Sequence, residues 1–434
     1  MQPGPVTTRV VLQLALPAAL GAWLQHAFRP VDQYFAQFVS GDAQGALGAS
    51  TFVTILAFGA FVTISAGVGP LVGRATGAVD GATRGRAIGT ALVVAMGIAV
   101  ATALCALVGA HWVPGLLGLE GEEARLTGVY LWWLGVTGGA IAVQPVVEAS
   151  FNAMGFTRRS MTLQGTAVVL NTALTAVLVL GLGMGIVGAA LGTTVTQALV
   201  TGIGVVWLRR TAGPASWQAD WPMAVRIVRL GLPVGLSTAA YALVYFALIR
   251  TTVAPLGQVK GLAVGFSALE AMSWPVFVGW SIAVSSLVAR HLGAGQPDEA
   301  AKAVRLALPW SLGAGVMTAL IFTFGGPWLV RVFSADAVVQ QQAVVYAAIL
   351  AWSQPFVALE ALFEGVLLGS GDTRRLAWVT IPLNVLRVPL AWLLAMPLGF
   401  GAVGIWWAIN LTTMGKAGLK GGLVWRGRWK DVAV

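Results

Sequence analysis

The sequence predicts an all-α membrane protein with twelve transmembrane helices, arranged as two parallel-repeat six-helix lobes around a central cavity. Three observations lead to this prediction: the composition is apolar, the apolar runs are long, and the second half of the chain repeats the plan of the first. Of the 434 residues, 57% are hydrophobic and only 10% are charged. Because a soluble domain carries about 25% charged residues, most of this chain is expected to contact lipid.

The internal repeat is visible in four motifs that recur at one offset, 216 residues (230 − 14 for the first). The pairs are Leu14–Pro17 with Leu230–Pro233, Leu71–Arg74 with Leu287–Arg290, Gly155–Arg159 with Gly371–Arg375, and Gly183–Gly188 with Gly399–Gly404. Six spans per repeat is an even number, so both repeats enter the membrane in the same orientation. We expect an N-lobe at 1–208, a cytoplasmic linker at 209–222 and a C-lobe at 223–434.

Twelve apolar ranges are long enough to cross the hydrocarbon core, which requires about 20 helical residues. The ranges are 10–38, 46–72, 86–110, 126–152, 160–180, 184–208, 224–254, 261–289, 302–325, 336–368, 375–396 and 401–425. Several exceed the minimal length, which permits tilting or kinking.

The distribution of Lys and Arg predicts the orientation of the chain. Twenty of these 26 residues, counting Lys416 and Lys420, are assigned to one alternating set of loops and to the termini, and four to the opposite set. The positive-inside rule then places both termini in the cytoplasm of a multi-pass protein of the inner (plasma) membrane. We therefore attribute the net charge of +10 to membrane topology. The lipid bilayer is the expected partner, and no nucleic-acid binding is expected. We expect a monomer.

Several function classes lack their sequence signatures. Gly183–Gly188 and Gly399–Gly404 match G-x-G-x-x-G, but a dinucleotide site needs a preceding strand, so we interpret both as tight external hairpins between spans. No ATP-binding P-loop motif occurs. The single Cys105 excludes disulfides within the chain. No nucleophile–base or metal-ligand cluster is evident, so we expect neither an enzyme nor a metal or cofactor.

Ionisable residues inside spans are costly in lipid and are therefore the leading functional candidates. Asp32 lies in the first span, with His26 and Arg29 in the two preceding turns. Arg29 can reach Asp32 or Gln33 along the helix. The group is either a neutralised structural pair or a carboxylate that takes up and releases a proton.

Further candidates lie in the second half. Glu270, which precedes Pro275, is either a second protonatable site or a partner for backbone freed by that proline. Glu360 and Glu364 share a helix face, so at least one is expected to be protonated or paired. We rank Glu360 higher for function, because Glu364 has a repeat mate in Glu148.

The remaining basic candidate is Arg387, whose counterpart in the first half is Asn171. This arginine is expected to pair with a carboxylate of the tenth span or to contact an anionic substrate.

Over nearly its whole length the chain resembles the multidrug and toxic compound extrusion (MATE) transporters of bacteria. The resemblance rests on Leu14–Gly21, Pro30–Asp32, Leu71–Asp80, Gly155–Arg158, Leu287–Pro297 and Gly365–Arg374, and the last two stretches are quite specific. It implies two six-helix lobes, a central cavity and cation-coupled drug export by alternating access.

The resemblance also implies roles for individual residues. Asp32 occupies the family's first-helix aspartate position, linked to proton coupling, Asn171 its fifth-helix asparagine and Glu270 its eighth-helix glutamate. Two departures weaken a sodium-coupled interpretation: Thr175 and Val357 stand where some members carry acids. A seventh-helix acid is also missing.

These observations together predict a proton-coupled antiporter that exports amphipathic, lipophilic and cationic compounds, with Asp32, Glu270 and Glu360 as coupling residues. Its coupling ion is H⁺, with Na⁺ left open. His26, Arg29, Gln33, Asn171, Glu364 and Arg387 are expected to support the cavity. One alternative is a flippase for a lipid-linked or anionic substrate of the same superfamily, motivated by Arg29 and Arg387. A second is a Na⁺-coupled exporter, and a third, a membrane scaffold, would not need the buried acids.

Overall fold

A computed structural model describes residues 3–213, 218–334 and 336–432 of the chain. The side chains of residues 29, 30, 52, 267 and 268 lie outside the described part. The described residues are helical apart from short turns and connections, and no strand occurs among them.

The N-terminal half contains nine α-helices and a π-helical turn. These are α1 (Thr8–His26), α2 (Phe28–Ala36), α3 (Gly41–Gly77), α4 (Gly81–Gly109), α5 (Val113–Leu116), α6 (Gly121–Thr137), α7 (Gly139–Ala153), α8 (Thr157–Ala176), η1 (Val177–Gly181) and α9 (Gly185–Ala212).

The C-terminal half repeats this order with more interruptions. Its elements are α10 (Trp221–Leu248), η2 (Ile249–Val253), α11 (Val259–Gly265), η3 (Phe266–Glu270), α12 (Ala271–Gly293), α13 (Pro297–Leu320), η4 (Ile321–Gly325), α14 (Gly326–Phe333), α15 (Ala337–Ala351), α16 (Gln354–Ser370), α17 (Thr373–Ala395), α18 (Gly401–Trp425) and η5 (Arg428–Asp431).

The predicted all-helical, two-lobed membrane fold is confirmed. Within the described residues, nine helices are long and apolar enough to cross a membrane, and two bent pairs bring the number to eleven. The pairs are α6 with α7, bent by 55°, and α15 with α16, bent by 58°, and they occupy equivalent places in the two repeats. The twelfth predicted range corresponds to α18, whose 25 residues include two lysines on its buried face.

Two spans are interrupted at their candidate acids. The first predicted span divides into α1 and α2 at Ala27, three residues before Pro30. Proline lacks the amide that would bond to the carbonyl four residues earlier, which weakens the helix at that turn. The eighth span contains the π-helical turn η3, which ends at Glu270 and lies just before Pro275. Such single π turns are frequent at functional sites.

The hairpins predicted at the two G-x-G-x-x-G motifs are present as tight turns. Gly183 precedes α9 and Gly185 is its first residue, with φ of 64° and 58°, a region that favours glycine. Gly399 and Gly401, at the equivalent positions before and at the start of α18, have φ of 71° and 55°.

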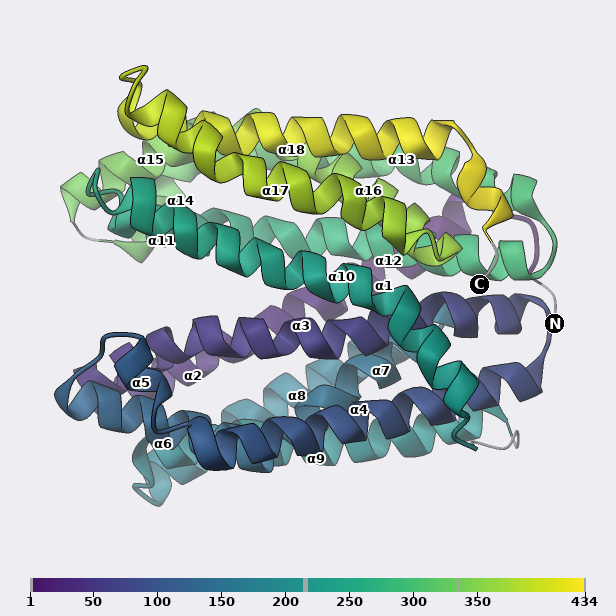
Figure 1. Cartoon of the computed structure of the whole chain (residues 1–434), viewed down its shortest axis with the longest axis horizontal. Helices are drawn as coiled ribbons and strands as arrows, with labels where there is room; N and C mark the ends of the chain where they lie inside the picture. The colour runs from purple at the N-terminus through teal and green to yellow at the C-terminus, as the bar shows by residue number, and fades with distance from the viewer. Residues whose placement is uncertain (1–2, 214–217, 335, 433–434) are drawn as a thin grey trace.

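The two lobes form two layers of helices, α2–α9 in one and α11–α18 in the other, with α1 and α10 at the boundary (Figure 1). α10 packs along α3, and α1 packs along α12. Small residues allow these approaches: a Cβ on Gly279 of α12 would lie 2.6 Å from the backbone nitrogen of Ala19 in α1. A Cβ on Gly235 of α10 would lie 2.7 Å from the carbonyl oxygen of Gly59 in α3.

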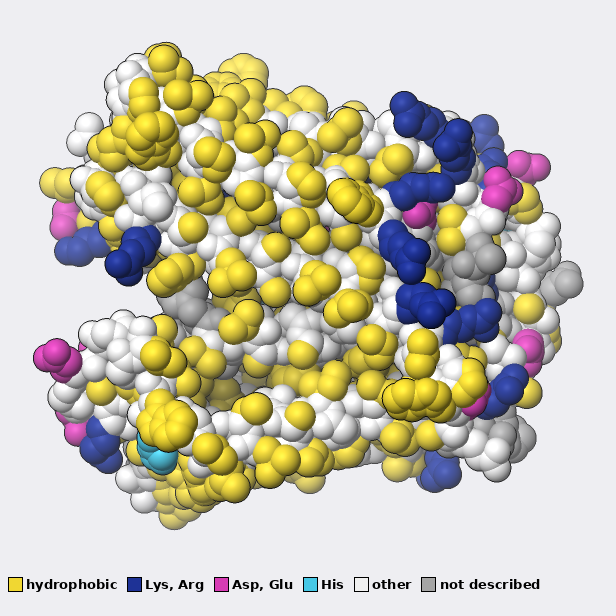
Figure 2. All heavy atoms as spheres, viewed as in Figure 1, with side chains coloured by type: hydrophobic (Ala, Val, Ile, Leu, Met, Phe, Trp, Pro, Cys, Tyr) yellow, Lys and Arg dark blue, Asp and Glu magenta, His cyan; other side chains and the backbone are white. Residues whose placement is uncertain are grey.

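The molecule is closed at one end and hollowed at the other. The termini and most Lys and Arg side chains gather at the closed end, and Figure 2 shows a notch between the lobes at the opposite end. At the closed end, the guanidinium of Arg74 in α3 donates to the carbonyl oxygens of Ser370 at 2.9 Å and Val432 at 2.7 Å. This arginine therefore ties the N-lobe to the C-lobe.

Candidate functional site

Asp32 lies where three helices of the N-lobe meet. Its carboxylate on α2 is buried, with 6% of the residue exposed. The hydroxyl of Thr193 on α9 lies 3.1 and 3.3 Å from its two oxygens. Asn171 on α8 donates its amide to the same hydroxyl at 3.1 Å and to Thr175 at 3.4 Å. Asp32 and Asn171, both predicted from the sequence, are thus joined through Thr193.

This arrangement holds Asp32 through a neutral donor. One hydroxyl has a single proton, so it cannot neutralise the charge of an ionised carboxylate. Burying an unpaired carboxylate is costly, and taking up a proton removes that cost. The site can therefore hold either a neutral acid or an anion that is costly to bury. A group that couples proton uptake to a conformational change requires this property.

The three other residues predicted near Asp32 are Arg29, Gln33 and His26. The side chain of Arg29 lies outside the described part, so its pairing with Asp32 stays a prediction. Gln33 donates its amide to the carbonyl oxygen of Gln44 at 3.4 Å, across to α3. His26 ends α1 and is exposed.

A second N-lobe carboxylate is also held by neutral groups. Glu148 on α7 accepts hydrogen bonds from the amides of Gln144, at 2.9 Å, and Gln164. Its repeat mate Glu364 is bound by a lysine. Sequence analysis treated the two glutamates as structural equivalents, but their surroundings differ: Gly204 occupies the place that corresponds to Lys420.

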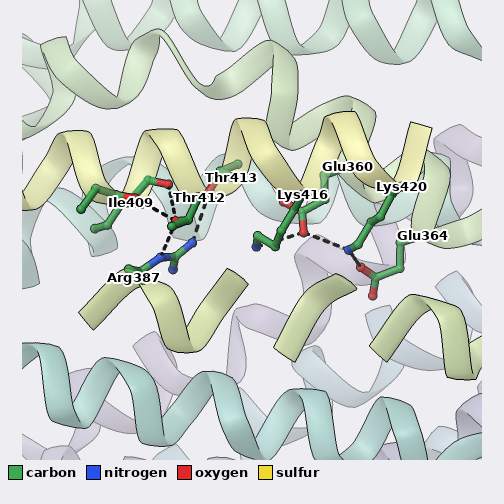
Figure 3. Close-up of polar contacts among 9 residues, drawn as sticks. Glu360, Glu364, Arg387, Ile409, Thr412, Thr413, Lys416 and Lys420 are labelled. Carbon is green, nitrogen blue, oxygen red and sulfur yellow. Dashed lines mark hydrogen bonds and ion pairs between the residues drawn. The ribbon is translucent and has the colours of Figure 1, made fainter. Parts of the chain in front are cut away.

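The C-lobe contains a charged network that the sequence analysis missed. Lys416 and Lys420 were assigned to the cytoplasmic loops, yet both are buried on the inner face of α18. The ammonium of Lys420 lies 2.9 Å from Glu360 and 2.7 Å from Glu364, and that of Lys416 lies 3.0 Å from Glu360 (Figure 3). The basic count of the predicted cytoplasmic set falls accordingly to 18 (20 − 2).

A sequence signal for this network was present. Lys416 and Lys420 are four residues apart on one span, as are Glu360 and Glu364 on another. Residues at this spacing share a helix face, and opposite charges facing each other relieve the repulsion within each pair. The expectation that the α16 acids need a partner therefore agrees with the contacts of Lys420.

Arg387 has other partners than those expected. Its guanidinium donates to Thr412 at 3.1 Å and Thr413 at 3.3 Å, both on α18. Its central carbon lies 5.4 Å from the ring centre of Tyr245 on α10. Within the described side chains, neither glutamate of α16 contacts it. The prediction that Arg387 pairs with a carboxylate of that span was therefore wrong.

Glu270 forms no ion pair with Lys416 or Lys420 among the described contacts, although the charges of Arg387 and Lys416 act on it. Its carboxylate accepts a hydrogen bond from the hydroxyl of Tyr346 on α15. Its side chain therefore does not bind the backbone freed by Pro275, which was one expectation. The acids of α16 are thus paired with lysines, whereas Asp32 has no cation among its described contacts.

The chain was compared with known proteins. The family model MatE matches residues 17–177 and again 233–393. A probable multidrug resistance protein NorM of Bradyrhizobium diazoefficiens is 28% identical over 94% of this chain and 91% of its own length. The multidrug export protein MepA of Staphylococcus aureus is 22% identical over 92% of this chain and 90% of its own length.

Solved structures share the fold. An outward-facing multidrug resistance MATE family transporter of the MOP superfamily superposes with a TM-score of 0.89, at 19% identity, over 97% of this chain and 95% of its own. A MOP superfamily transporter from Pyrococcus furiosus, described as having a binding pocket of reverse polarity, gives a TM-score of 0.89 at 17% identity, over 98% of this chain and 97% of its own.

Proposed function

The chain belongs to the MatE family, and on that premise we propose that it is a multidrug efflux antiporter driven by protons. The observation that carries the proposal is the buried carboxylate of Asp32, which the neutral hydroxyl of Thr193 holds at the junction of three helices. A carboxylate with no described cationic contact gains most from protonation. It is therefore suited to link proton uptake to a change of conformation.

The basic residues support the proposed orientation. With Lys416 and Lys420 removed from the count, 18 Lys and Arg remain on the predicted cytoplasmic side against four on the other. Both termini are then cytoplasmic in the plasma membrane, and the notch in Figure 2 opens outward. We retain the N-lobe at 1–208, the linker at 209–222 and the C-lobe at 223–434, acting as a monomer.

The proposed cycle follows from the cost of a buried charge. An external proton neutralises Asp32 while the cavity faces outward, and α2 can then repack against α8 and α9. That repacking weakens substrate binding, so substrate leaves outward. Return of the proton to the cytoplasm restores the anion and the loading state. The linkage requires that proton and substrate favour different states.

The charge balance of the two lobes supports cationic substrates. In the C-lobe, Glu360 and Glu364 are paired with Lys416 and Lys420. In the N-lobe, Asp32 and Glu148 are held only by neutral groups among the described side chains. The interior of the N-lobe therefore carries negative charge whenever these acids are ionised, which favours a cationic substrate over an anionic one.

One observation favours the alternative of an anionic substrate. Arg387 is buried, with 2% of the residue exposed, and bonds only to neutral hydroxyls within the described side chains. An arginine in that state has donors suited to a phosphate or carboxylate. Flipping of a lipid-linked or anionic compound is therefore the second candidate function.

The test is transport in proteoliposomes under an imposed pH gradient. Asp32→Asn is expected to abolish pH-driven export of an ethidium-like dye, because an amide cannot cycle a proton yet is no costlier to bury than the acid. Asp42→Asn, at an exposed carboxylate near the start of α3, is the matched control and should transport normally.

Three results would contradict parts of the proposal. Normal pH-driven export by Asp32→Asn would move coupling to another acid. Export driven by a sodium gradient alone would favour Na⁺ over H⁺. If no cationic dye is exported under either gradient and Arg387→Ala instead impairs movement of an anionic dye, the alternative function replaces the first.

A further inference from the structure

A basic pocket lies between α4 of the N-lobe and α10 of the C-lobe, at the closed end of the molecule. It has a volume of about 480 Å³, within the roughly 300–1,000 Å³ of small-molecule sites. Its polar lining includes Arg86, Arg226, Arg229, Thr83 and Asp220. Three arginines and one aspartate give the lining a net positive charge.

The arginines of the pocket are available to a ligand. Arg226 and Arg229 are one turn apart on α10, and both are exposed, as is Arg86 on α4. None of the three forms an ion pair with a described carboxylate, and the hydrogen bond described for Arg86 goes to the hydroxyl of Thr83, at 3.4 Å. Guanidinium groups without an acidic partner are the preferred ligands of phosphate oxygens.

The internal repeat provides a comparison for this pocket. The positions equivalent to Arg226 and Arg229 are Val10 and Gln13 on α1. The position equivalent to Arg86 is Lys302, whose ammonium lies 3.2 Å from Glu299. The same fold is thus built in the other lobe without arginines at these three positions. The three arginines are therefore not required by the architecture.

The surroundings of the pocket are those of a membrane interface. Trp221, which begins α10, is 79% exposed, and Val225, which lines the pocket, is 38% exposed. Exposed tryptophans concentrate at the level of lipid headgroups. A phosphate bound to the arginines would accordingly have apolar side chains beside it for the first part of an acyl chain.

We propose that this pocket binds the phosphate of an anionic phospholipid headgroup, bridging Arg86 of one lobe to Arg226 and Arg229 of the other. Basic pockets between transmembrane helices on the cytoplasmic side bind such headgroups. Because α4 and α10 belong to different lobes, the bound lipid stabilises the closed arrangement of this end. The proposal does not depend on which substrate the protein carries.

The test measures lipid binding rather than transport. The purified full-length protein is delipidated in detergent, titrated with phosphatidylglycerol or phosphatidylcholine, and examined by native mass spectrometry. Wild type is expected to retain phosphatidylglycerol in preference. Each basic group near a lipid surface contributes about 1 kcal/mol, so Arg86→Ala/Arg226→Ala/Arg229→Ala should weaken that binding about a hundredfold.

The matched control removes the same charge from the same end of the protein. Arg158, Arg374 and Arg426 are exposed and lie outside the pocket, and their triple alanine variant should keep wild-type binding. Should the pocket triple variant lose a monodisperse elution profile, Arg226→Ala/Arg229→Ala replaces it, with an expected loss of about thirtyfold. Wild-type lipid binding by the folded pocket variants, or equal loss in the control, would overturn the proposal.

A second arm distinguishes a lipid from free phosphate. Inorganic phosphate in excess over the lipid is expected to leave bound phosphatidylglycerol in place, because the free ion cannot contact Val225 and the neighbouring apolar surface. Displacement of the lipid by phosphate at comparable concentration would assign the pocket to a soluble anion and overturn the lipid assignment.

Discussion

Removing the guanidinium of Arg74 should open the closed end of the molecule. This side chain, on α3, donates to the carbonyl oxygens of Ser370 and Val432 in the other lobe, at 2.9 and 2.7 Å. Ser370 is the last residue of α16, where carbonyl groups lack helical partners. Arg74→Ala removes both bonds and takes this donor away from the buried carbonyl of Ser370, while the packing of α10 on α3 is unchanged.

The size of the effect can be worked from the two bonds. A hydrogen bond to a charged group contributes about 1.5–3 kcal/mol to stability. Arg74 is only partly buried, so solvent screening reduces this gain. We take about 2 kcal/mol for the pair. That energy corresponds to a change of roughly thirtyfold in the ratio of closed to open forms at this end.

Spin labels on the closed ends of α3 and α16 would measure this ratio as distance distributions. Arg74→Ala should populate a longer distance that wild type lacks, whereas Arg158→Ala, at an exposed arginine of the same end, should not. If folded Arg74→Ala gives an unchanged distance distribution, helix packing alone closes this end. The two hydrogen bonds of Arg74 would then not be needed for closure, and the prediction would be wrong.

Two further predictions concern packing and buried charge. Lys420→Met should destabilise the protein by about 3–5 kcal/mol, because it removes one of the two lysines that pair with buried Glu360 and the lysine that pairs with partly exposed Glu364. Lys302→Met, at a partly exposed pair, should cost at most about 1 kcal/mol, and equal shifts in thermal midpoint would contradict this. Gly279→Val should cost about 1–3 kcal/mol through overpacking against α1. Gly97→Val, where a Cβ meets no atom within 4 Å, is its control, and the prediction fails if both variants melt alike.

The fold was predictable because its signals are repeated and long. Apolar runs of span length give helices, and a shared offset of 216 residues gives two lobes, without any tertiary information. The breaks inside the spans were harder to predict from the sequence. The interruption at Ala27 depends on one proline near a span end, and the bend between α6 and α7 falls at Gly138, one glycine among the 55 in the chain.

The site was predictable only in part, because contacts between spans do not follow from periodicity. Asp32 stood out as a carboxylate within an apolar run. Thr193, its hydrogen-bond donor, is one of several hydroxyls on α9, and nothing in its spacing distinguishes it. Lys416 and Lys420 lie near the predicted cytoplasmic end of a span, so a charge count assigned them to a loop. The packing of α18 against α16 shows that they face inward, which their four-residue spacing, matching that of Glu360 and Glu364, could have indicated.

The two lobes share a backbone but differ in their buried charges. The repeat mate of Asp32 is Leu248, that of Lys420 is Gly204, and that of Glu270 is Thr54. If these charges served only folding, duplication would be expected to keep them in both lobes, as it kept the turn glycines Gly183 and Gly399. In the C-lobe the acids of α16 contact lysines, whereas in the N-lobe the carboxylate of Asp32 is held by the neutral hydroxyl of Thr193. This asymmetry supports the proposal that proton exchange takes place in the N-lobe.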